Sequence, residues 1–172
     1  MNTTKGRVIV NTGKGKGKTT AAMGMMLRAW GHDMKVVVLQ FVKHATVGEH
    51  HAAQRMSVEM VAGGAGFTFR GKNIEKNDQM ARELWVVAAE KINSGVYDMV
   101  ILDEMTYALE YGWLNIDEVL DTLRHRPEKL HVIITGRNAP QALIDFADTV
   151  VEIADIKHAH KQGVKAQAGI EY

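Results

Sequence analysis

A glycine- and lysine-rich turn near the start of the chain has the residue types that bind phosphate. Residues 13–20 read GKGKGKTT. The glycines let the backbone approach an anion, and a helix starting there would point its free N–H groups at the phosphate oxygens. Lys18 can reach the outer phosphates, and the Thr19 hydroxyl is placed to hold Mg²⁺. The predicted phosphate-binding residues are Gly13, Lys14, Gly15, Lys16, Gly17, Lys18, Thr19 and Thr20.

This turn departs in one place from the P-loop consensus G-x-x-x-x-G-K-[ST]. Gly17, Lys18 and Thr19 match, but Thr12 occupies the position of the first glycine. The phosphate chain can therefore follow a different path, and the orientation of the nucleotide is left open. A flexible surface turn is the alternative interpretation. The apolar stretch before the turn and the helix-forming stretch after it favour the P-loop.

Two carboxylates, Asp103 and Glu104, close an apolar stretch at 97–104. A strand that delivers carboxylates at its C-terminal end is what a P-loop enzyme uses to orient Mg²⁺. The alternative is that these side chains cap the turn that follows. Together with the P-loop, the pattern favours Thr19, Glu104 and Asp103 as the metal site.

Arg137 follows another predicted buried strand, at 131–135. Open α/β sheets bind ligands at the carboxyl ends of their strands, so Arg137 should lie at the same edge as the P-loop. Its planar, forked cation suits anionic oxygens. Arg137 is therefore a candidate phosphate clamp, with an ordinary surface arginine as the alternative. Lys18, Thr19, Glu104 and Arg137 form the predicted catalytic set.

Alternating strands and helices must position these residues. Short β-branched runs predict strands at 8–10, 35–42, 58–61, within 97–104, at 131–135 and at 149–153, and helical patterns cover 21–30, 78–93, 117–124 and 140–146. The first strand, helix and strand read as a βαβ unit, so these two strands should be parallel. We predict one α/β domain over residues 1–172, a P-loop NTPase-like (RecA-like) three-layer sandwich with a mostly parallel central sheet. The tail, about 157–172, is expected to fold over the site.

The pattern weakens between residues 43 and 77, where four glycines surround Phe67 and Phe69. A mobile surface loop and a segment tucked into the edge of the core are both open there. Trp85, in the next predicted helix, is expected to pack in the core.

Bulk composition excludes several classes of protein. The formal net charge of +1 over 172 residues gives no indication of nucleic-acid binding. The absence of cysteine excludes disulfides and thiolate chemistry. No apolar N-terminal stretch or membrane-length run is visible, which predicts a cytoplasmic protein without a membrane partner. Two histidine pairs, at 50–51 and at 158 and 160, lack further ligands at a recognisable spacing, so solvated histidines are favoured over a metal site.

The residues above, with further segments of the chain, resemble the motifs of a known family. Segments in order along nearly the whole chain resemble the P-loop type of ATP:corrinoid adenosyltransferase: TGKGKGKTTAA (12–22), RA (28–29), GH (31–32), QFVK (40–43), GFT (66–68), LDEMTY (102–107), TGR (135–137), KH (157–158) and GVKAQAGIEY (163–172). The P-loop alone is generic. The strand-end LDEMTY and the tail motif are much more specific.

The resemblance implies transfer of the 5′-deoxyadenosyl group of MgATP to Co(I) of cobalamin, cobyrinic acid a,c-diamide or a related corrinoid, with release of triphosphate. ATP in this family lies reversed relative to ordinary P-loop enzymes. The sequence offers no evident general base and no guanine-selective N-K-x-D motif, in agreement with an ATP reaction whose nucleophile has no proton to lose.

The resemblance also assigns roles to residues. It implies that Thr19 and Glu104 hold Mg²⁺ with Asp103 behind them, that Arg28 lies near the nucleoside, and that Phe67 and Phe69 lie close to the lower face of the corrinoid. It further implies a homodimer and an electron-donor protein for Co(II). Lys14 replaces a common asparagine and Phe69 a common tryptophan. The alternative functions are a P-loop kinase or ATPase acting at phosphorus, and a non-catalytic, nucleotide-gated corrinoid carrier.

Overall fold

One parallel sheet organises the chain in the computed structural model, which describes residues 5–42, 48–63 and 74–171. Its six strands lie in the order β3-β2-β4-β5-β1-β6, and every adjacent pair is parallel. The strands are β1 (Val8–Thr12), β2 (Val36–Gln40), β3 (Glu59–Ala62), β4 (Met99–Asp103), β5 (His131–Thr135) and β6 (Thr149–Glu152). The predicted α/β class and parallel sheet are therefore confirmed.

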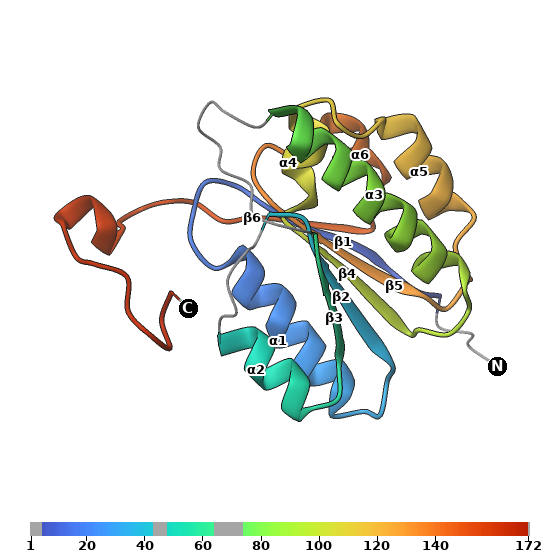
Figure 1. The fold of residues 1–172 in the computed structure, drawn as a ribbon, viewed down its shortest axis with the longest axis horizontal. Helices are drawn as coiled ribbons and strands as arrows, with labels where there is room; N and C mark the ends of the chain where they lie inside the picture. The colour runs from blue at the N-terminus through green and yellow to red at the C-terminus, as the bar shows by residue number, and fades with distance from the viewer. Residues whose placement is uncertain (1–4, 43–47, 64–73, 172) are drawn as a thin grey trace.

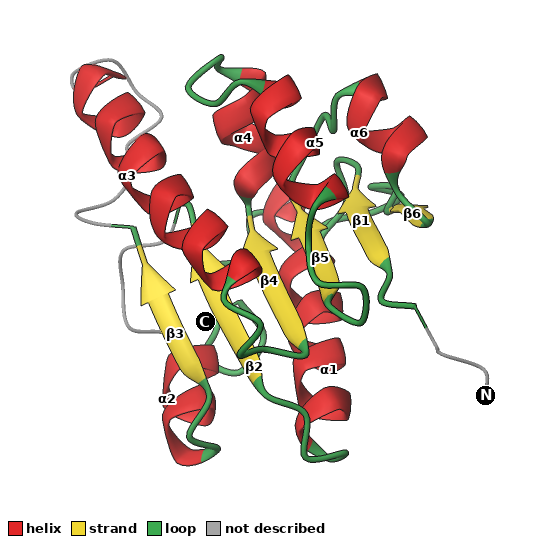
Figure 2. Ribbon diagram, turned by 90° about the vertical axis from the view of Figure 1, so that its right-hand side faces the viewer, coloured by secondary structure: helices red, strands yellow, loops and turns green. Residues whose placement is uncertain are grey.

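Helices cover both faces of this sheet, as Figures 1 and 2 show. One face carries α1 (Lys18–Trp30) and α2 (Gly48–Arg55); the other carries α3 (Ile74–Asn93), α4 (Met105–Glu110), α5 (Ile116–Arg124) and α6 (Gln141–Phe146). Because side chains alternate across a strand, the central strands contribute side chains to both cores. Val37 and Leu39 of β2 pack in the α3 side, whereas Val36 and Val38 pack under α1. The result is the predicted three-layer sandwich.

The strands that flank α1 are parallel, as predicted, but are not neighbours. β1 pairs with β5 and β6, and β2 pairs with β4 and β3, so β4 and β5 lie between them. Central strands β2 and β4 are buried at every residue, which accounts for their continuous apolar runs. The edge strand β6 is exposed throughout.

Two helices were not predicted from the sequence. α2 begins at Gly48, within the stretch where the hydrophobic pattern is weak, and buries only Ala53. α4 is six residues long and begins directly after Glu104. Trp85 of α3 is buried in the core, which confirms its predicted role. Phe67 and Phe69 lie outside the described residues.

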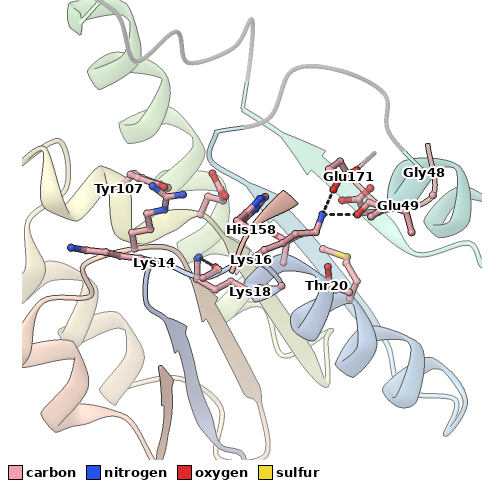
Figure 3. Close-up of a pocket in the computed structure, with 17 residues that line it drawn as sticks. Lys14, Lys16, Lys18, Thr20, Gly48, Glu49, Tyr107, His158 and Glu171 are labelled. Atoms are coloured by element: carbon pink, nitrogen blue, oxygen red, sulfur yellow. Dashed lines mark hydrogen bonds and ion pairs between the residues drawn. The ribbon is translucent and has the colours of Figure 1, made fainter. Parts of the chain in front are cut away.

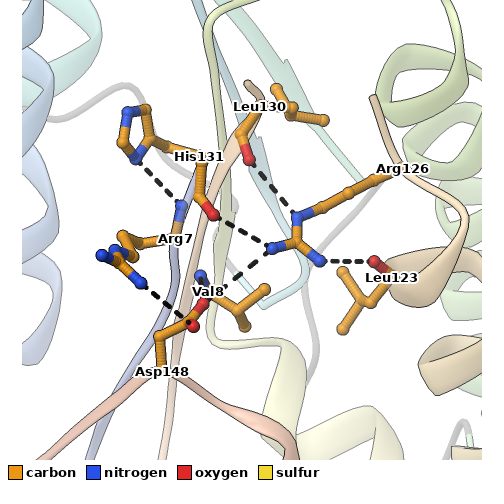
Figure 4. A network of polar contacts seen from close by, with 8 residues as sticks. Arg7, Val8, Leu123, Arg126, Leu130, His131 and Asp148 are labelled. Atoms are coloured by element: carbon orange, nitrogen blue, oxygen red, sulfur yellow. Dashed lines mark hydrogen bonds and ion pairs between the residues drawn. The ribbon is translucent and has the colours of Figure 1, made fainter. Parts of the chain in front are cut away.

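The amino ends of the central strands are held together on the side opposite the P-loop. Arg126 donates to the carbonyl oxygens of Leu123, Leu130 and Gly6, at 2.6, 3.3 and 3.2 Å. Asp148 accepts from the Val8 backbone N–H at 2.8 Å and lies 3.9 Å from the Arg126 guanidinium (Figure 4). This network fixes the start of β1, and the P-loop at the other end of β1 therefore follows a rigid strand.

The tail runs outward after β6 and returns toward the P-loop, as Figure 1 shows. It contains one 3₁₀ turn, Ala159–Gln162, and its residues are mostly exposed. Lys161 pairs with Asp155 at 2.6 Å near its start. In the part of the chain described here, no helix is both long enough and apolar enough to cross a bilayer.

Candidate nucleotide-binding site

The carboxyl ends of three neighbouring strands meet at one pocket of about 520 Å³ (Figure 3). The P-loop follows β1, Glu104 follows β4 and Arg137 follows β5. The pocket is lined by residues 14–20 and 169–171 and by Met23, Gly48, Glu49, Glu104, Tyr107, Arg137 and His158. The structure thus brings together the P-loop, Glu104 and Arg137, which are far apart in the sequence.

The P-loop is tied to the end of the edge strand. Gly13 has φ 99°, and a Cβ there would lie 2.5 Å from the Ile153 carbonyl oxygen, so glycine is required by both backbone angle and space. The Gly15 N–H donates to the same carbonyl at 2.7 Å. The unusual Thr12 is buried, and its hydroxyl accepts from the Ala139 N–H at 3.2 Å, which links the P-loop strand to the segment carrying Arg137.

The positive end of α1 faces this pocket. α1 begins at Lys18, immediately after Gly17, and has no acidic residue in its first turn. Its unpaired N–H groups and its dipole therefore remain available to an anion. This is the arrangement by which P-loops bind phosphate.

Lys18 is a nearly buried cation at the base of the pocket. Its side chain folds back, and Nζ donates to the Gly15 carbonyl oxygen at 2.6 Å. Burial lowers the pKa of the Lys18 ammonium, and the Arg137 cation lowers it further, while Glu104 and Asp103 act in the opposite direction. A polyphosphate bound in the pocket would place negative charge next to this ammonium and so favour its charged form.

Asp103 is fully buried behind the pocket rather than lining it. Its Oδ1 accepts from the Thr19 hydroxyl at 2.8 Å and from the Thr135 hydroxyl at 2.7 Å. Because the Thr19 proton is directed at Asp103, the lone pairs of the hydroxyl are left for another partner. Asp103 is therefore placed to orient Thr19.

Glu104 lines the pocket with an unusual backbone conformation. Its φ of 58° places it in the left-handed region at the start of α4, and its N–H donates to the Thr135 hydroxyl at 2.9 Å. Its side chain makes no capping hydrogen bond to α4. The alternative reading, in which the two carboxylates merely cap the next turn, is therefore not supported.

Arg137 reaches the pocket from a turn that α4 holds in place. The Thr106 hydroxyl donates to the Arg137 carbonyl oxygen at 2.5 Å. The Arg137 side chain is exposed and lines both this pocket and a neighbouring one of about 390 Å³. After burial, which is the main cause, the Arg137 cation contributes to the lowered pKa of Lys18.

Comparison with known proteins identifies the family. The model of "ATP:corrinoid adenosyltransferase BtuR/CobO/CobP" matches residues 4–172. The chain belongs to this adenosyltransferase family. It is 44% identical to the "Corrinoid adenosyltransferase" of Escherichia coli K12, covering 98% of this chain and 86% of the relative. It is 41% identical to that of Pseudomonas aeruginosa, covering 98% and 84%.

A third relative and a solved structure complete the comparison. The chain is 42% identical to "Corrinoid adenosyltransferase CobA" of Salmonella typhimurium, covering 98% of this chain and 86% of the relative. Flagellar accessory protein FlaH of Methanocaldococcus jannaschii has a similar fold, with a TM-score of 0.54 at 10% identity over 86% of this chain and 71% of FlaH. The predicted family and P-loop-like fold class are thus confirmed.

The oxygen atoms at this pocket fit Mg²⁺ held together with a nucleotide. Mg²⁺ prefers oxygen ligands and is usually bound by one or two protein groups, substrate phosphates and water. The Thr19 hydroxyl and the Glu104 carboxylate offer such groups at one pocket. Within the described ranges, no cluster of three or more histidine, aspartate or glutamate side chains could hold a metal alone.

The structure does not bring every predicted residue to the pocket. Arg28 lies exposed in the last turn of α1 and does not line it, so its place near the nucleoside stays a prediction. Met23 and Tyr107 line the pocket and were not predicted as site residues. A signal existed for both: Met23 lies four residues after Thr19 on α1, and Tyr107 three after Glu104 at α4, so each shares a helix face with a predicted residue.

Residues of the tail line the pocket and contact the P-loop. Lys16 Nζ donates to the Ile170 carbonyl oxygen at 2.8 Å and to Glu171 Oε1 at 3.0 Å. Figure 3 shows Lys16 directed toward Glu171. One lysine of the P-loop is thus paired with a carboxylate of the tail.

Proposed function

We propose that this protein transfers the 5′-deoxyadenosyl group of MgATP to Co(I) of cobalamin or a related corrinoid and releases triphosphate. The supporting observation is that one pocket gathers the P-loop, Glu104 and Arg137 in a chain of the corrinoid adenosyltransferase family. These groups are suited to gripping a polyphosphate.

The proposed reaction balances without a general base. Co(I) attacks C5′ of the ribose with its nonbonding electron pair, and the new Co–C bond replaces the C5′–O bond. That bond's electron pair leaves with the triphosphate. Since the nucleophile carries no proton, the protein's task is to orient C5′ and to stabilise the departing charge.

The residues around the P-loop are suited to that task. Apart from the Gly15 N–H, which donates to the Ile153 carbonyl oxygen, the N–H groups of 13–19 at the start of α1 would bind the phosphate oxygens. Lys18 and Arg137 would add two cations to the departing triphosphate, and Arg137 can do so with a bidentate fork. Because Lys18 is nearly buried and held at the Gly15 carbonyl oxygen, it would need little reorganisation as the charge develops.

Thr19 and Glu104 would hold Mg²⁺, with Asp103 orienting Thr19 from behind. Bound there, Mg²⁺ supplies further neutralisation of the phosphate charge. Lys14, Lys16 and Thr20 complete the predicted phosphate contacts. Arg28 is proposed for the nucleoside, and Phe67 and Phe69 for the lower face of the corrinoid, where excluding the lower axial ligand would ease reduction of Co(II).

We also propose a cytoplasmic homodimer that receives electrons from a separate reductase. These proposals extend the family resemblance to the assembly and its redox partner. Sedimentation analysis of the purified protein tests the dimer, and a monomer at micromolar concentration would contradict it.

One assay separates the proposed reaction from its alternatives. The protein is mixed with ATP, Mg²⁺ and chemically reduced cobalamin, and absorbance and phosphate products are followed. Adenosyl transfer yields a Co–C bond and triphosphate in equal amounts. ADP with phosphate would indicate a kinase or ATPase, and binding without consumption of either substrate would indicate a carrier. Either result would overturn the proposal.

A further inference from the structure

A row of buried polar side chains crosses the sheet beneath the P-loop helix. Four neighbouring strands, β2, β4, β5 and β1, carry Gln40, Asp103, Thr135 and Asn11 near their carboxyl ends. The strand register pairs Gln40 with Asp103 and Asn11 with Thr135. All four are at most 2% exposed. Burying polar groups is costly unless they are hydrogen-bonded, so this row calls for an explanation.

Asp103 is the centre of the row. Both threonine hydroxyls, of Thr19 and Thr135, donate to its Oδ1. Gln40 Nε2 donates to the other oxygen, Oδ2, at 3.0 Å. The carboxylate is therefore held on both oxygens, and Gln40 fixes the one on the β2 side. A carboxylate held in this way cannot turn about its Cβ–Cγ bond without breaking a buried hydrogen bond.

The Gln40 amide is itself fixed, at a cost. Turning it over would bring its carbonyl oxygen against the Asp103 carboxylate, so Nε2 must face Asp103. In this orientation Gln40 Oε1 is buried and has no hydrogen-bond partner among the residues that the structure describes. An unpaired buried acceptor lowers stability, and Gln40 carries that cost while its amide holds Asp103 Oδ2. A buried polar side chain that is kept at such a cost fits a role in function.

We propose that Gln40 is a positioning residue for metal binding: through Asp103 it fixes the direction of the Thr19 hydroxyl. Gln40 does not line the pocket, so it would act through Asp103. With the orientation of the carboxylate fixed, the Thr19 hydroxyl keeps donating its hydrogen bond to Asp103. The lone pairs of the hydroxyl then stay directed at the cation. The inference rests on the proposed function, because it assigns the Thr19 oxygen to Mg²⁺ bound with a polyphosphate.

The test measures binding, not turnover. Tripolyphosphate is titrated into the protein by calorimetry over a range of Mg²⁺ concentrations and again in EDTA. Gln40→Met keeps the length of the side chain and loses the N–H donor. In this variant we expect that about tenfold more Mg²⁺ is needed for half of the Mg²⁺-dependent increase in tripolyphosphate affinity. Binding in EDTA should stay as in the wild type, since the N–H cradle is untouched. Gln40→Leu, which also removes the donor, should show the same shift and serves if the methionine variant does not fold.

Asn11→Leu is the matched control. Asn11 lies at the other end of the row, is equally buried and also has an unpaired atom, Nδ2, but donates nothing to Asp103 in the structure. Its replacement should change stability and leave the Mg²⁺ dependence unchanged. A wild-type Mg²⁺ dependence in a folded Gln40 variant, or an equal shift in Asn11→Leu, would overturn this inference alone. If the tripolyphosphate affinity of the wild-type protein does not depend on Mg²⁺, the proposed metal site is overturned as well.

Discussion

At the scale of single residues, the position of Lys18 makes it hard to replace. Lys18 is 8% exposed, and its ammonium donates to the Gly15 carbonyl oxygen inside the P-loop. We expect Lys18→Ala to lower adenosyl transfer at least 100-fold, because the leaving triphosphate loses a fixed cation. Lys18→Arg should be similarly inactive, because the larger, planar guanidinium does not fit the buried position in which the compact ammonium donates to the Gly15 carbonyl oxygen. Steady-state rates with pre-reduced cobalamin check this, and activity of the arginine variant above one tenth of wild type would contradict it.

Glu104 gives a second residue-scale prediction. Its side chain is at the pocket and does not cap α4, so its replacement should leave the fold intact. We expect Glu104→Gln to lower turnover about 100-fold and to raise the Mg²⁺ concentration needed, because a neutral amide is a weaker ligand for a hard cation. Turnover measured against Mg²⁺ concentration checks this. His50→Ala, on α2, is the control and should behave as wild type. Near-normal turnover in Glu104→Gln would contradict the metal assignment.

At the scale of elements, the tail contact should depend on pH. Lys16 and the Gln167 N–H, which donates at 2.8 Å, both lower the pKa of Glu171, and the backbone bond contributes most. A lowered pKa means that the closed tail is favoured when Glu171 is ionised. This preference is complete above the ordinary carboxyl pKa and is lost as pH falls through the lowered value. We expect Glu171→Gln to loosen the tail at neutral pH as acid does in the wild type.

Hydrogen exchange of residues 167–171 measures that loosening. Because the pair is solvent-exposed, the change should be confined to the tail, with the protection of β1 unchanged. Lys157→Gln, on the same tail and without a contact to Lys16 in the structure, is the charge control. Equal protection in wild type and Glu171→Gln at neutral pH would mean that the carboxylate does not hold the tail.

The strands and helices that could be predicted from the sequence are those marked by a pattern within their own residues. β-Branched runs and the P-loop placed β1, β2, β4 and β5 and the start of α1 within a few residues. α4 was not predicted because it starts directly from Glu104, which has a left-handed φ of 58° and whose N–H donates to the hydroxyl of Thr135, a residue distant in sequence. α2 buries a single alanine and so has almost no apolar stripe to detect.

At the scale of the whole molecule, the site depends on strand order, which local patterns cannot give. Sequence placed Asp103, Arg137 and the P-loop at the carboxyl edge of one sheet. It could not say that β4 and β5 lie between β1 and β2. That order places Asp103 within hydrogen-bonding distance of both Gln40 and Thr19. The row of buried polar residues is therefore a tertiary feature, visible only once the strands are assembled.

Ligand binding at such a site should stabilise the whole chain. The pocket joins β1 and α1 to the ends of β4 and β5, and unfolding of any of them would destroy it. A ligand at about 100 times its Kd adds about 2.7 kcal/mol to the free energy of unfolding. For a chain of 172 residues this corresponds to a rise in Tm of about 5–10 °C. We expect Mg²⁺ with tripolyphosphate to give this rise in one cooperative transition, measured by calorimetry. Lys18→Ala under the same conditions should show little of it, and two separate transitions would contradict a single domain.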